Sequence, residues 1–133
     1  WIPHQNVDEV YDIEKIGFEG EKGFAVLLRP DHFQEEKRSE WALRLVWDRV
    51  ISYTVTDESY RPELWVSEKT PDWALWAFYV SETSDHLTRF REENYLVLED
   101  THHFFICGTN LMADILSDEF PAVAFLKWDP KLR

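Results

Sequence analysis

The residues best suited to chemistry in this chain are its histidines and its cysteine. The sequence has five histidines and one cysteine, and no two histidines have a spacing that would bind a metal from one helix. His102 and His103 adjoin a predicted strand, so their side chains point to opposite faces and cannot bind one metal together. One cysteine is too few for a cysteine-based zinc site. We therefore predict no metal and no cofactor, and a hydrogen-bonded structural histidine at the sheet edge in preference to a catalytic one.

Nucleophilic catalysis is not indicated by the remaining motifs. Cys107 follows Phe104, Phe105 and Ile106, a setting in which cysteine behaves as a small apolar core residue. The glycines form no phosphate-binding loop, and no Gly-x-Ser-x-Gly motif is present. Asp57 and Glu58 can form half of an acid–base pair, but we expect a solvated turn or a partner-facing pair there. No catalytic residue is predicted.

Carboxylates dominate the surface chemistry that the sequence implies. Asp and Glu number 26 against 14 Lys and Arg, which gives a net charge of −12. Such a charge repels nucleic acids and anionic membranes and favours basic partners. The alternative is a solvated face that only keeps the protein soluble. Because tryptophans adjoin the acidic segments, and aromatic anchors ringed by charge are typical of tight interfaces, we predict these partner-binding residues: Asp57, Glu58, Trp65, Trp73, Glu92, Glu93, Asp114 and Asp118.

The elements that must position these residues follow from hydrophobic periodicity. We predict an α+β fold, a mostly antiparallel β-sheet with two helices packed on one face. The first helix begins after Ser84 as N-cap and runs to about Asn94, and the second follows the turn at residues 108–110 and is ended by Pro121. The predicted strands are residues 23–28, two within 41–57 separated by a break near 47–49, a central strand at 73–80, 104–107 and 122–126. The strand–helix–strand order at residues 104–126 predicts one parallel pair.

Length and composition predict one domain over residues 1–133, with residues 1–21 as an N-terminal arm that carries a helical turn around residues 10–16. No apolar run approaches about 18 residues, so no transmembrane helix is expected. The chain also begins with no recognisable signal peptide. A single cysteine suits a reducing compartment. We therefore expect a cytoplasmic protein, and the oligomeric state stays open.

Two stretches resemble a known kind of protein. One is the segment of residues 43–58, LRLVWDRVISYTVTDE, and the other joins SDHL at 84–87 to HFFICGTN at 103–110 and DILSDEFPAV at 114–123. Together they resemble small bacterial proteins encoded beside polymorphic toxins and regarded as their immunity proteins. The resemblance covers roughly residues 41–126 and contains no catalytic motif. It implies an intracellular bacterial protein that binds and blocks a protein partner.

These observations predict a non-enzymatic, acidic, immunity-like module that neutralises a basic toxin by occlusion. Its acidic side chains would replace substrate phosphates at a basic cleft, while aromatic side chains supply the buried anchors. The alternative is a small-ligand-binding or enzymatic α+β domain with a tryptophan-lined pocket. The two hypotheses differ in the surface they require, because the alternative needs a cavity of several hundred cubic ångströms with converging polar groups.

Overall fold

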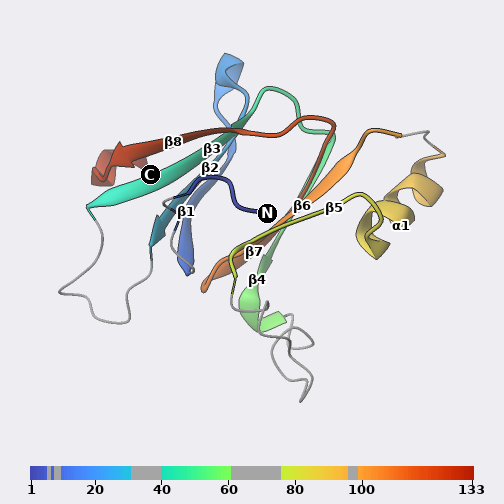
Figure 1. Ribbon diagram of the computed structural model, residues 1–133, viewed down its shortest axis with the longest axis horizontal. Coiled ribbons are helices and arrows are strands. Elements are labelled where there is room, and N and C mark those ends of the chain that lie inside the picture. The colour runs from blue at the N-terminus through green and yellow to red at the C-terminus, as the bar shows by residue number, and fades with distance from the viewer. Residues whose placement is uncertain (6, 8–9, 31–39, 61–75, 96–98) are drawn as a thin grey trace.

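In the part of the chain that the structure describes, two four-stranded sheets with antiparallel strand pairs form the framework (Figure 1). The computed structural model describes residues 1–5, 7, 10–30, 40–60, 76–95 and 99–133. Sheet A has the strand order β1-β2-β3-β8 and sheet B the order β4-β7-β6-β5. The elements are β1 (Tyr11–Phe18), η1 (Gly20–Lys22), β2 (Phe24–Pro30), β3 (Trp41–Trp47), β4 (Ser52–Asp57), η3 (Glu58–Tyr60), β5 (Phe78–Ser81), α1 (Asp85–Asn94), β6 (His102–Cys107), β7 (Leu111–Ser117), β8 (Ala122–Lys127) and η6 (Pro130–Leu132).

An aromatic and aliphatic core joins the two sheets. Alternate residues of β2 and β3 pair across the ladder, as Phe24 does with Trp47, and both side chains are fully buried. The Trp47 ring meets Phe104 of sheet B edge to face, with ring centroids 5.4 Å apart. Tyr11 of β1 meets Phe78 of β5 at 5.4 Å in the same manner. These contacts bring one face of each sheet into the same hydrophobic cluster.

The second predicted helix is wrong, because residues 111–117 form β7 between β4 and β6. Its sequence is almost continuously apolar, and Met112 to Ser117 are all buried. A short apolar run of this kind shows neither the 3.6-residue period of a helix nor the two-residue period of a strand, so its sequence does not distinguish a helix from a strand. Gly108 begins a tight hairpin from β6, since a Cβ there would lie 2.7 Å from the Leu111 carbonyl oxygen. The predicted parallel pair is wrong for the same reason.

The N-terminal segment contributes to the framework, and no helical turn forms around residues 10–16. Residues 11–18 are β1, with Tyr11 and Ile13 buried. The side chain of Asn110, in the β6–β7 turn, accepts from the Ile13 N–H and donates to the Ile13 carbonyl oxygen, both at 2.9 Å. These two hydrogen bonds connect the β6–β7 hairpin of sheet B to strand β1 of sheet A. Trp1 also packs against the core, with its ring 5.1 Å from that of Phe104.

Several other predictions are confirmed. The strand at residues 24–30, the break that separates β3 from β4, and the strands β6 and β8 lie close to their expected ranges. Helix α1 begins at Asp85, and the Ser84 hydroxyl accepts from the Leu87 N–H at 3.1 Å as its N-cap. The strand predicted as central at 73–80 is instead the edge strand β5, and residues 73–75 lie outside the described ranges.

The run from Phe104 to Cys107 is not buried throughout. Phe104 and Ile106 face the core, but Phe105 and Cys107 lie on the opposite face of β6 and are partly exposed. Successive side chains of a strand point to opposite faces, so four consecutive apolar residues place two side chains on each face of the sheet.

Trp47 should be a main contributor to stability. Truncation to alanine is expected to lower the free energy of unfolding by about 3–5 kcal/mol, because it opens a cavity between the sheets. Trp47→Phe should cost less, since a ring remains against Phe24 and Phe104. The matched control is Trp41→Ala, at a side chain that is 54% exposed, which should cost less than about 1 kcal/mol. Urea denaturation of the three variants tests this; equal losses for Trp47→Ala and Trp41→Ala would contradict the packing described here.

Candidate functional site

The negative charge of the described chain is concentrated on sheet B and its connections. Residues 49–60, 76–95 and 99–120 hold eleven acidic and three basic residues, a formal charge of −8. The acidic ones are Asp57, Glu58, Glu82, Asp85, Glu92, Glu93, Glu99, Asp100, Asp114, Asp118 and Glu119, and the basic ones are Arg49, Arg89 and Arg91. We call this part of the molecule the acidic half.

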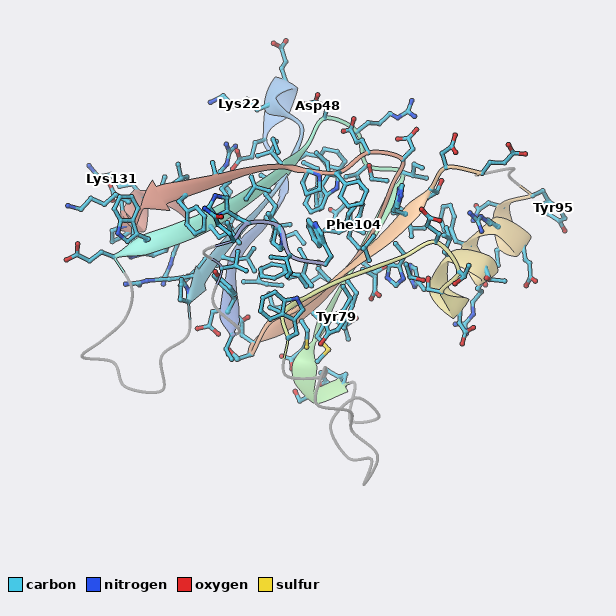
Figure 2. The ribbon with its side chains drawn as sticks, viewed as in Figure 1. Lys22, Asp48, Tyr79, Tyr95, Phe104 and Lys131 are labelled. Carbon is cyan, nitrogen blue, oxygen red and sulfur yellow. The ribbon has the colours of Figure 1, made fainter. Side chains whose placement is uncertain are left out.

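Sheet A and its connections are balanced in charge. Residues 10–30, 40–48 and 121–133 hold seven acidic and seven basic residues. The acidic ones are Asp12, Glu14, Glu19, Glu21, Glu40, Asp48 and Asp129, and the basic ones are Lys15, Lys22, Arg29, Arg44, Lys127, Lys131 and Arg133. Figure 2 shows Lys131 of this balanced half and Tyr95, which follows α1, at opposite ends of the molecule. Within the described residues, the net negative charge therefore lies on the sheet B half, and the sheet A half is neutral overall.

The predicted partner-binding carboxylates divide into exposed and buried groups. Glu92 and Glu93 are exposed on α1, and Asp57 is exposed at the end of β4. The hydroxyl and the backbone N–H of Ser59 both donate to Asp57 and hold the pKa of its carboxyl below the usual value. Asp118 forms an ion pair with Arg49, so part of its charge is compensated locally. Trp65, Trp73 and the side chain of Glu58 lie outside the described part of the chain.

Asp114 is not on an exposed helix face, as the sequence analysis assumed. It lies on β7, and only 5% of the residue is exposed. Its Oδ1 lies 2.8 Å from Nε2 of His103, on the neighbouring strand β6. Asp114 therefore cannot contact a partner directly, and its buried carboxylate is hydrogen-bonded as a buried charge requires.

His103 links Asp114 to the start of α1. Its Nδ1 lies 2.7 Å from the Ser84 hydroxyl oxygen, which also caps the helix. His103 is 8% exposed, and the ring of His86 stacks on its imidazole with ring centroids 4.7 Å apart. Because an ionised carboxylate only accepts, Nε2 carries a proton toward Asp114, and in the neutral ring Nδ1 then accepts from Ser84. The predicted hydrogen-bonded histidine fits His103, although β6 is an inner strand and not a sheet edge. Its two partners were not predicted from the sequence. Ser84 was expected only as a helix cap, and Asp114 was expected on a helix.

Exposed aromatic side chains also lie on the acidic half. Tyr60 and Tyr95 are 80% and 95% exposed, and Tyr53 and Phe120 are 43% and 52% exposed. Tyr95 follows the last residue of α1 in a left-handed conformation with φ of 53°. None of these four rings was among the predicted partner-binding residues, because the exposure of a single ring in a turn or on an edge strand depends on tertiary packing.

Sheet A carries a hollow on its outer face, with a volume of about 230 Å³. Its lining residues are Glu19, Lys22, Leu27, Arg44, Leu126 and Leu132. None of them is a tryptophan, so the hollow differs from the pocket that the alternative hypothesis assumed. Hydrogen bonds from Lys15, and to a smaller extent from Arg44, lower the pKa of the Glu19 carboxyl. The Glu19 carboxylate of this hollow is therefore already paired with cationic side chains.

The comparisons with known proteins leave the family open. No protein-family model, no curated protein and no solved structure matches the chain. Within the ranges that the structure describes, no three His, Cys, Asp or Glu side chains gather as a metal ion would require. No helix of the described part is long and apolar enough to span a bilayer.

The His103–Asp114 pair should matter for stability far more than the exposed carboxylates. His103→Ala removes the 2.8 Å hydrogen bond from His103 to the buried Asp114 carboxylate and is expected to cost about 3–5 kcal/mol. Glu92→Ala, on the exposed face of α1, should change the free energy of unfolding by less than about 0.5 kcal/mol. Denaturant melts of both variants provide the measurement. A loss below about 1 kcal/mol for His103→Ala would show that the pair is not a structural link.

Proposed function

We propose that this chain is an acidic protein-binding module that docks a basic protein on its acidic half and blocks it by occlusion, as an immunity protein blocks a toxin. The observation that carries the proposal is the division of charge, −8 on the sheet B half against a balanced sheet A half. A charge needed only for solubility has no reason to gather on one half of the molecule, whereas a complementary interface does.

The surface chemistry supports both steps of such an association. Exposed carboxylates such as Glu92 and Glu93 create the field that attracts a basic partner before contact. Exposed rings such as Tyr60 and Tyr95 offer large apolar area at low conformational cost after docking. If the partner acts on a phosphate-containing substrate, the carboxylates take the place of the phosphates in its cleft. Trp65 and Trp73 remain proposed anchors, and a cytoplasmic setting is part of the same proposal.

Small-ligand binding is the second candidate function. The hollow on sheet A favours it, because apolar Leu27, Leu126 and Leu132 lie beside the cationic groups of Lys22 and Arg44. At about 230 Å³, the hollow is smaller than the roughly 300–1,000 Å³ typical of drug-sized ligand sites. A basic protein partner therefore remains the leading proposal.

A pull-down with this chain as bait should first be tried on the product of a neighbouring gene. The rate at which the chain associates with the basic partner found in this way tests the proposal. The rate should fall about tenfold or more from low to high salt, because steering acts through screened charges. Glu92→Gln with Glu93→Gln should slow association several-fold. Tyr95→Ala should instead speed dissociation, since an anchor acts after docking.

The matched control neutralises the same number of carboxylates on the balanced half, Glu21→Gln with Glu40→Gln, both exposed. That variant should associate at nearly the wild-type rate. A binding rate that is flat with salt, or equal losses in the two double variants, would show that the acidic half does not steer a partner.

A further inference from the structure

We propose that Ser84, His103 and Asp114 form a nucleophilic triad that accepts an acyl group from an ester at the Ser84 hydroxyl. This is an activity separate from partner binding, and it does not depend on the proposed function. The three side chains come from the start of α1, from β6 and from β7.

The geometry is that of a nucleophile, a base and an orienting acid. The Ser84 oxygen and His103 Nδ1 are 2.7 Å apart, and His103 Nε2 and Asp114 Oδ1 are 2.8 Å apart, both within hydrogen-bond reach. His103 and Asp114 are buried, whereas Ser84 is partly exposed. A partly exposed nucleophile backed by a buried base and acid is the arrangement that acyl transfer needs.

The hydrogen-bond directions fit the reaction. With the imidazole in its neutral form, the Ser84 hydroxyl donates to Nδ1 and accepts from the Leu87 N–H at 3.1 Å, which leaves one lone pair on the oxygen for attack. As Ser84 Oγ bonds to the ester carbonyl carbon, its proton moves to Nδ1, and the Nε2–H stays hydrogen-bonded to Asp114. The C–O bond to the alcohol then breaks, and the alcohol leaves with the Nδ1 proton. Water hydrolyses the acyl-Ser84 by the same proton path in reverse, releasing a carboxylic acid.

The start of α1 adds electrostatic support to this step. The N–H groups of the first helical turn have no acceptor within the helix, and the helix dipole favours negative charge there. The N–H of Asp85 lies directly after the nucleophile, the position from which a backbone N–H stabilises the oxyanion of a tetrahedral intermediate.

The surroundings of Ser84 restrict the class of ester. Glu82 and Asp85 are exposed on either side of it in the sequence, and both carboxylates repel an anionic substrate. An uncharged or cationic ester is therefore the substrate class that fits this site. A negatively charged ester should react more slowly.

An uncharged fluorophosphonate probe, which phosphonylates activated serine hydroxyls with loss of fluoride, tests the proposal on the intact protein. Intact mass should show one adduct on the folded chain and none after denaturation. Peptide mapping of the wild-type adduct should place it on Ser84, so this result depends on no variant. A wild-type protein that stays unlabelled, or an adduct at another residue, overturns the proposal.

Matched variants separate the triad from a helix-capping role. Ser84→Asn keeps a good N-cap but removes the hydroxyl, so it should melt normally and lose the adduct. Asp114→Asn should slow labelling by about 10²–10⁴-fold, the usual contribution of acid–base assistance. Thr83→Ala, which removes the neighbouring exposed hydroxyl, should label at the wild-type rate. Labelling that persists in Ser84→Asn, or an unchanged rate in Asp114→Asn, would show that the network only caps α1.

Discussion

The edge-to-face packing of aromatic rings between the two sheets is the interaction on which the rest of the structure depends. Trp47 against Phe104 and Tyr11 against Phe78 hold one face of sheet A against one face of sheet B. Such pairs contribute about 0.5–1.5 kcal/mol each beyond the area they bury. Because both inner faces are used in this way, charged side chains are left to the outer faces and the connections. Packing therefore explains why charged side chains lie outside the core, but not why the acidic ones gather on the sheet B half.

The outer side of sheet B carries helix α1 and the Ser84–His103–Asp114 network. Helix α1 lies beside β5 and β6 at the end of the molecule remote from sheet A (Figure 1), and the Ser84–His103–Asp114 network connects its first turn to two strands. The same helix presents Glu92 and Glu93 to solvent, so the network also fixes where these charges lie. Gathering like charges on one half costs stability through repulsion, which salt relieves at distances beyond about 10 Å. A docked basic partner would relieve the same repulsion.

The sequence was sufficient for elements with a clear period or a clear boundary. Ser84 and Leu87 defined α1, and the alternation around Trp47 defined β3 and its break from β4. It was insufficient for β7, because Met112 to Leu116 have neighbours on both faces and no alternation marks them. That error moved Asp114 from the interior to a supposed helix surface. Glu92 and Glu93 were placed correctly on a solvent-exposed helix, whereas the pairing of His103 with Asp114 depends on strand register, which a single sequence does not specify when both faces are buried.

The most direct test of the central claim, that the acidic half is a surface for basic partners, is an NMR titration of the isotope-labelled chain with a short lysine- and arginine-rich peptide. Amide shift changes should gather on α1, on residues 99–100 and at the end of β4 near Asp57, and they should disappear at high salt. Shift changes spread evenly over both sheets, or concentrated on β1, β8 and η6, would contradict it.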